Sequence, residues 1–132
     1  MKVLHFIYAL GQGGAERFVI DLSNEQSIDN EVKLYAFRDD SIDNQGFFVS
    51  EIGNKVTYIN LKIKPGFKPR LSWKFYKILK AERPDVVHCH LNLVNYFFLS
   101  SLIFKNKIRF VYTLHSPPEA EVESEREKNI RR

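Results

Sequence analysis

Apolar and polar positions divide the chain into short strand-like runs separated by helical stripes. A nearly continuous apolar or β-branched run is typical of a strand that is covered on both faces of a parallel sheet. Five such runs occur, at residues 3–8, 32–37, 56–60, 85–90 and 109–114. Because helical stripes separate them, this order predicts an α/β fold with a doubly wound, Rossmann-like, mostly parallel sheet.

The segments between these strands have the spacing of helices. The first helix is expected from Ala15 onward, and its apolar positions are Ala15, Phe18, Val19 and Leu22. A second helix should end before Pro84, and its apolar stripe is Leu71, Phe75, Ile78 and Leu79. Residues 93–104 are apolar nearly all round, which predicts a helix enclosed by its neighbours. A short packed helix is expected around Phe47, Phe48 and Ile52.

Length and composition indicate one globular domain. The chain has 132 residues, of which 44% are hydrophobic and 27% are charged, so neither a wholly disordered nor a membrane-spanning protein is favoured. We expect a Rossmann-like domain over 1–118 that is incomplete. Residues 119–132 are densely charged, so this tail is expected to be disordered or to begin a helix whose packing partner is missing.

The beginning of the chain and its single cysteine bear on the compartment. The apolar run at 3–8 is short and breaks at a glycine loop without a convincing cleavage site, so it is interpreted as a buried strand and not as a signal sequence. Cys89 is the only cysteine, which rules out an intrachain disulfide and suits a reducing compartment. We therefore expect a cytoplasmic protein.

Basic residues gather in the middle of the chain, where residues 62–83 interleave them with Phe67, Trp73, Phe75 and Tyr76. This pattern suits an interfacial helix beside anionic lipid headgroups and predicts a peripheral contact with the inner face of the membrane. An ordinary amphipathic helix with lysines facing water explains the same residues. No nucleic-acid-binding motif is recognisable, so a nucleic-acid partner is not expected.

A glycine-rich loop, Gly11–Glu16, lies between the first strand and the first helix. Backbone N–H groups and the positive end of a helix can hold a phosphate at such a place. Gly13 and Gly14 could instead serve only a tight turn. A dinucleotide-binding domain is a further alternative: Asp39 follows the second strand as a ribose-binding acid would, although Glu16 stands where that motif has a small residue.

Three histidines lie near the predicted carboxyl ends of two strands. His88 and His90 alternate onto one face of a strand, and His115 follows the next strand. Ligands of open α/β sheets bind at these carboxyl ends, so His90 and His115 are expected to meet the Gly13 loop in one crevice. His88 is expected to fix a loop by hydrogen bonding. A zinc hydrolase with all three as ligands is also chemically possible.

In combination these features resemble the N-terminal domain of family 4 glycosyltransferases, which have the GT-B fold. The resemblance extends from Met1 to about His115 and is carried by Lys2–Phe6, Gly11–Arg17, Pro84–His90 and Tyr112–His115. It implies transfer of a sugar from a nucleotide-sugar donor to a polysaccharide or lipid-linked acceptor, with retention of configuration and no required metal or other cofactor. Such enzymes serve cell-envelope and polysaccharide biosynthesis.

The resemblance also implies roles for particular residues. Gly13 and Gly14 match the loop that lies against the donor diphosphate, Glu16 matches the acidic residue of that loop, and His115 matches the catalytic histidine that reaches the transferring sugar. With His90, these residues are expected to line the cleft between two domains.

The second, nucleotide-binding domain of the family is absent from this chain. Charge neutralisation and positioning of the donor would then be incomplete, so the chain alone is expected to have little or no activity. A non-catalytic partner subunit is a further alternative that the sequence leaves open.

Overall fold

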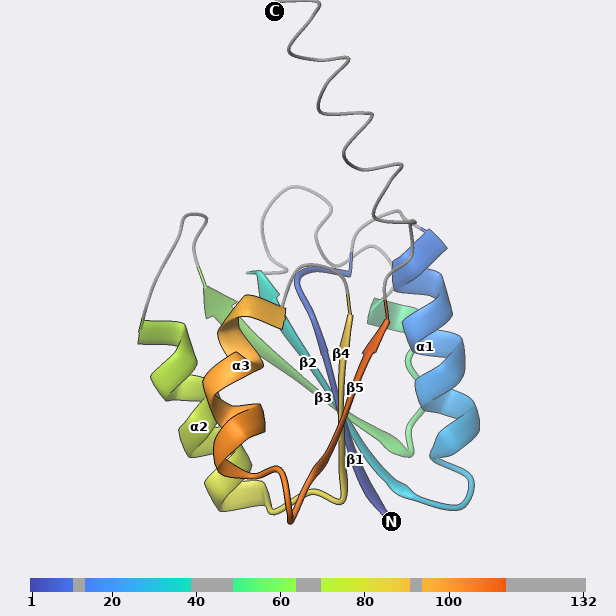
Figure 1. The fold of residues 1–132 in the computed structure, drawn as a ribbon. Helices are drawn as coiled ribbons and strands as arrows, with labels where there is room; N and C mark the ends of the chain where they lie inside the picture. Colours follow the sequence, from blue (N-terminus) through green and yellow to red (C-terminus); the bar gives the residue numbers. More distant parts are fainter. Residues whose placement is uncertain (11–13, 39–48, 64–69, 91–93, 114–132) are drawn as a thin grey trace, which may run out of the picture.

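The computed structural model describes residues 1–10, 14–38, 49–63, 70–90 and 94–113, and Figure 1 shows strands and helices in alternation over these residues. In chain order the elements are β1 (Lys2–Ile7), α1 (Gly14–Gln26), β2 (Glu31–Arg38), the 3-10 turn η1 (Val49–Glu51), β3 (Val56–Ile63), α2 (Arg70–Glu82), β4 (Val86–His90), α3 (Val94–Ile103) and β5 (Arg109–Thr113). All five predicted strands and the three main helices are therefore present.

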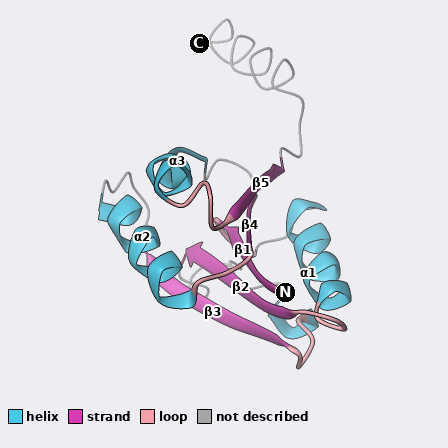
Figure 2. Cartoon of the chain, turned by 60° about the horizontal axis from the view of Figure 1, so that its bottom comes forward, coloured by secondary structure: helices cyan, strands magenta, loops and turns pink. Residues whose placement is uncertain are grey.

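The five strands form one sheet in the order β3-β2-β1-β4-β5, and every neighbouring pair is parallel. Helix α1 covers one face, while α2 and α3 lie side by side on the other (Figures 1 and 2). The arrangement confirms the prediction of a doubly wound, Rossmann-like α/β fold. All strands end at the same edge, which is the upper edge in Figure 1.

The core has two layers because β1 and β2 are buried on both faces. Leu4 and Phe6 of β1 pack toward α2 and α3, whereas Val3 and Ile7 pack toward α1. On the α2 side the filling is aromatic: the ring of Phe75 stacks on Phe97, with centroids 4.4 Å apart. Continuous apolar runs in the sequence are thus explained by strands without a solvent-facing side.

Two predicted helix faces differ from the structure. In α1 the buried residues are Val19, Ile20 and Ser23, and Phe18 is 44% exposed. Among the described residues helix α3 is not enclosed, because it packs against α2 and, through Phe97, against the sheet, while its other side is exposed. Its exposed apolar residues are Phe98, Leu99, Leu102 and Ile103. A helix that is apolar all round carries no amphipathic signal, so its sequence does not reveal which side is covered.

The short helix expected near residue 50 is the 3-10 turn η1, and Phe47 and Phe48 lie outside the described residues. Asn24 of α1 holds this turn: its side-chain Oδ1 accepts a hydrogen bond from the Gly53 N–H at 2.7 Å, and its Nδ2 donates to the Glu51 carbonyl at 3.0 Å. The expected boundary at 118 and the charged tail also lie outside the described residues. Within the described part of the chain, no helix is long and apolar enough to cross a membrane.

Candidate functional site

The chain reverses its direction of winding between β1 and β4. From β1 it crosses to β2 by α1 on one face, and from β4 it crosses to β5 by α3 on the opposite face (Figure 2). Open α/β sheets bind ligands at such a switch point, beyond the carboxyl ends of the strands. The carboxyl ends of β1 and β4 are therefore the place at which the fold favours a ligand.

Helix α1 follows β1 in the chain, so its amino end comes soon after the carboxyl end of β1. Gly14 is the first residue of α1, and Glu16 lies in its first turn, where a carboxylate interacts favourably with the helix dipole. Within the described part of the chain, a Cβ added at Gly14 would meet no heavy atom within 4 Å beyond its chain neighbours and its own helix backbone, and the backbone there is not left-handed. Gly14 is therefore not required for packing or for a strained turn. Gly13 lies outside the described residues.

Three histidines gather on the α1 side of the sheet. His5 of β1 is the register partner of His88 on β4, and His90 lies two residues further along β4. The ring centroids of His88 and His90 are 4.1 Å apart, and that of His5 is 5.1 Å from His88. His5 and His90 are fully buried, while His88 is partly exposed. The predicted alternation of His88 and His90 onto one face is confirmed.

Hydrogen bonds join the cluster to α1. The side-chain oxygen of Gln26, at the carboxyl end of α1, is 2.6 Å from His5 Nε2, and His5 Nδ1 is 3.0 Å from His90 Nε2. An amide oxygen only accepts, so His5 Nε2 carries the proton that is donated to Gln26. Burial, reinforced by His88, lowers the pKa of His5 to about 4, although the Gln26 hydrogen bond opposes this shift.

The tautomer of His90 follows from these contacts. Because neutral His5 donates from Nε2, its Nδ1 is an acceptor, and the proton shared with His90 must come from His90 Nε2. The chain Gln26–His5–His90 therefore fixes both rings and both tautomers. The ring of Phe18 lies edge-on to His90, with centroids 6.5 Å apart. His90 is thus held beneath the first half of α1.

The structure brings some predicted site residues together and leaves others undescribed. His90 ends β4 next to β1, from which the chain leads into the loop before Gly14. His88 makes the expected hydrogen bond, but its partner is a strand residue: Nε2 contacts Thr113 Oγ1 at the end of β5. His115, like Gly13, lies outside the described residues, as does Asp39 of the dinucleotide alternative.

Sequence reasoning missed His5 and Gln26. The alternation of β1 does place His5 on one face with Val3 and Ile7. A histidine within an apolar run, however, indicates only a buried strand residue and not a functional one. Only the parallel register, which pairs His5 with His88, reveals that the residue belongs to a cluster. Gln26 could not be identified, because its contact depends on how far α1 extends along the sheet.

The same cluster offers nitrogen ligands for a metal ion. The potential ligand atoms of His5, His88 and His90 all lie within 4.8 Å of one another, and imidazole is a common zinc ligand. The predicted triad used His115 in place of His5. Both ring nitrogens of His5 are engaged, with Gln26 and with His90, so a metal would have to displace the His5–His90 hydrogen bond.

Cys89 has no part in this cluster. It alternates to the other face of β4, where it is buried in the core against α2 and α3. Burial raises the pKa of its thiol, so the reactive thiolate is disfavoured.

Comparisons with known proteins identify the family of this chain. A family model described as Glycosyltransferase Family 4 matches residues 12–132. The structure is also similar to a crystal structure of the C-terminal domain of a hydrogenase from Pyrococcus furiosus, with a TM-score of 0.56 and 13% sequence identity over 85% of this chain and 90% of that chain. At this identity the likeness shows the fold alone. No curated protein matches the chain.

Proposed function

Because the chain belongs to glycosyltransferase family 4, as an N-terminal domain of that family, we propose that it is the acceptor-side half of a retaining enzyme. The donor is a nucleotide-sugar, and the acceptor is a polysaccharide or a lipid-linked saccharide of the cell envelope. The reaction requires no metal and no other cofactor. The enzyme acts in the cytoplasm.

One observation supports this proposal most strongly: the amino end of α1 lies at the switch point of the sheet and leaves open space at Gly14. The first N–H groups of a helix have no partner within the helix, and the helix dipole adds positive potential there. A diphosphate leaving group gains negative charge during sugar transfer. Preorganised N–H donors at this position would stabilise that charge without reorganisation.

The proposed roles follow the geometry and the family resemblance. Gly13 and Gly14 lie against the donor diphosphate, and Glu16 orders the first turn of α1. His115 is the catalytic histidine that reaches the transferring sugar. His90 lies beneath the substrate site without exposed surface, and the His5 hydrogen bond fixes its ring.

The donor side of the site is expected to come from a second, nucleotide-binding domain, in cis or in trans. Without it, the diphosphate would meet only the helix end and the glycine loop, and the donor sugar would not be positioned against the acceptor. We therefore propose that the chain has little or no transferase activity alone.

Complementation with a family 4 nucleotide-binding domain tests the proposal. Release of nucleoside diphosphate from a panel of nucleotide-sugars is measured for the chain alone, the second domain alone and the two together. Turnover is expected only for the pair, and NMR of the product should show the anomeric configuration of the donor. Turnover by the chain alone, or an inverted product, would contradict the proposal.

We also propose that the exposed side of α2 touches the membrane that carries a lipid-linked acceptor. Trp73 is 61% exposed, stacks on Tyr76 at 5.3 Å, and has the Lys77 ammonium 5.4 Å from its ring centroid. A tryptophan beside lysines is typical of side chains at the headgroup level. Residues 64–69, which precede α2, lie outside the described part of the chain.

Co-sedimentation with anionic vesicles checks this surface. Reversing the charge of Lys77, as Lys77→Glu, is expected to lower vesicle binding about thirtyfold, because each elementary charge near an anionic surface contributes about 1 kcal/mol and the reversal changes two charges. Lys55→Glu makes the same charge change at an exposed residue just before β3 and serves as the control. Equal losses for the two variants would show a general charge effect and no defined surface.

A further inference from the structure

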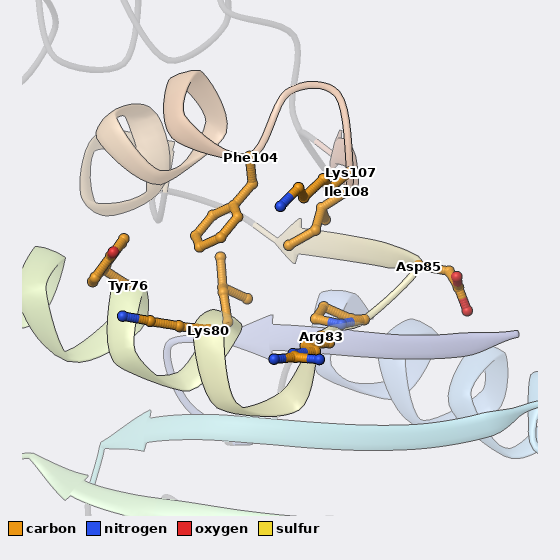
Figure 3. A pocket seen from close by; sticks show the side chains of 9 residues that line it. Tyr76, Lys80, Arg83, Asp85, Phe104, Lys107 and Ile108 are labelled. Atoms are coloured by element: carbon orange, nitrogen blue, oxygen red, sulfur yellow. The ribbon is translucent and has the colours of Figure 1, made fainter.

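A hollow lies at the edge of the sheet opposite the histidine cluster (Figure 3). It opens between the carboxyl ends of α2 and α3, where the chain turns into β4 and β5, and its volume is about 520 Å³. Pockets for small molecules are typically about 300–1,000 Å³. The hollow is therefore large enough for a small ligand, and it is separate from the proposed sugar-transfer site.

One side of this pocket is apolar. Leu79 of α2 and Ile108 before β5 are buried at its floor, and Phe104 projects over it from the end of α3. The ring of Phe104 stacks on Tyr76 with centroids 5.6 Å apart. These contacts fix an apolar and aromatic wall that would accept a short hydrocarbon or ring.

The rim is basic. Lys80 and Arg83 come from the end of α2, Lys107 comes from the turn after α3, and all three are exposed. The turns that carry them are closed by backbone hydrogen bonds, from Arg83 N–H to the Leu79 carbonyl at 3.0 Å and from Lys107 N–H to the Phe104 carbonyl at 2.9 Å. Among the described residues, none of the three basic side chains forms an ion pair.

The neighbouring carboxylates are occupied elsewhere. Glu82 binds Lys2 at 2.8 Å and Lys33 at 2.7 Å. Asp85 also lines the pocket, but its carboxylate accepts a hydrogen bond from the backbone N–H of Lys2 at 2.8 Å. Neither carboxylate is therefore paired with a cation of the rim.

Cations at helix carboxyl ends have an ordinary explanation, because they offset the negative end of the helix dipole. Each such end is equivalent to roughly half an elementary charge, so α2 and α3 together account for about one. The pocket is lined by three cations, Lys80, Arg83 and Lys107, and by one carboxylate, Asp85. Positive charge remains after the helix ends are compensated, and it faces an apolar wall.

We propose that this pocket binds a phosphate group carried on an apolar body. The phosphate accepts charge-assisted hydrogen bonds from Lys80, Arg83 and Lys107, and the body lies against Leu79, Phe104 and Ile108. Such a phosphate belongs either to the headgroup of a membrane lipid or to a soluble phosphate ester.

Hexyl phosphate is a suitable soluble probe, and the chain has a built-in reporter. Trp73 is the only tryptophan and stacks on Tyr76, which lines the pocket. Hexyl phosphate should change Trp73 fluorescence saturably. Its affinity should exceed that of inorganic phosphate or of hexanol by about tenfold or more. Inorganic phosphate lacks the apolar body, and hexanol lacks the phosphate group.

Arg83→Gly separates binding from folding. Arg83 has φ 49°, a left-handed conformation that glycine adopts without strain, so this variant should fold at least as well as the parent. It should bind hexyl phosphate about tenfold more weakly, and Lys80→Gln with Arg83→Gly about a hundredfold more weakly. The matched control is Lys74→Gln, an exposed α2 lysine outside the pocket, which should leave the affinity unchanged.

Vesicles distinguish the two sources of phosphate. If the source is a lipid, hexyl phosphate should displace the chain from vesicles that contain phosphatidic acid, and Arg83→Gly should weaken vesicle binding. If the source is a soluble ester, hexyl phosphate still binds, but vesicle binding is insensitive to Arg83→Gly. The proposal is overturned if hexyl phosphate binds no better than inorganic phosphate, or if Lys74→Gln weakens it as much as Arg83→Gly does.

Discussion

Replacing Gly14 with alanine in the enzyme joined to its second domain is expected to lower sugar transfer by roughly 10²- to 10³-fold, because a methyl group that holds the diphosphate away from the backbone N–H groups should cost about as much as the loss of one preorganised donor. The reason is local. The added methyl group would enter space that is empty in this structure and in which the diphosphate is proposed to approach the amino end of α1.

Stability should not fall in the same variant. Apart from its chain neighbours and its own helix backbone, no heavy atom of the described residues lies within 4 Å of the new Cβ, and the backbone at Gly14 suits any residue. Alanine favours the helical conformation over glycine by about 0.5–1 kcal/mol, so the free energy of unfolding should stay constant or rise. Urea denaturation and a transfer assay on the same preparation measure the two effects.

Gly53→Ala provides the opposite pattern as a control. A Cβ at Gly53 would lie 3.0 Å from Asn24 Oδ1, which accepts the Gly53 N–H, so stability should fall by about 1 kcal/mol while transfer per folded molecule is unchanged. If Gly14→Ala retained full transfer activity, the diphosphate would not approach the chain at Gly14.

Acidification from pH 6.5 to pH 4 is expected to remove about 3 kcal/mol from the free energy of unfolding. The pKa of His5 is lowered from 6.5 to about 4 in the folded chain, chiefly by burial. Between these pH values His5 is protonated in the unfolded chain but not in the folded chain. The free energy of unfolding therefore rises with pH across this window and is lost as the pH falls. Each pKa unit corresponds to 1.36 kcal/mol.

His5→Asn tests the assignment. Urea unfolding of both proteins at pH 7 and pH 4.5 gives the pH-dependent part of the stability, independent of what the substitution costs at neutral pH. We expect most of the loss below pH 6.5 to disappear in His5→Asn. His88→Asn serves as the control, since His88 is partly exposed and contributes only the smaller electrostatic part of the His5 shift. An unchanged pH slope in His5→Asn would show that other groups cause it.

The order of strands and helices could be predicted because each strand has a local signal. Residues such as Val3, Leu4 and Phe6 form an unbroken apolar run, and the stripe of Leu71, Phe75 and Leu79 has a clear helical period. These local patterns, together with the rule of parallel winding, were sufficient for the fold class.

Features that depend on pairing between distant segments could not be predicted. Helix α3 leaves Phe98 and Leu102 exposed, although its composition suggested an enclosed helix. The link from His5 to His90 depends on the register of β1 against β4, which no local pattern specifies. The sequence identified His88 and His90 as neighbours, because alternation within one strand is a local property.

The central claim is that a nucleoside diphosphate binds at the carboxyl ends of β1 and β4. Amide NMR of the two-domain protein, titrated with a panel of nucleoside diphosphates, tests this most directly. We predict saturable shifts at Gly14, Glu16 and His90 for at least one member, with no comparable shifts at Arg83 or Lys107. Shifts confined to Arg83 and Lys107, at the opposite edge of the sheet, would contradict the account.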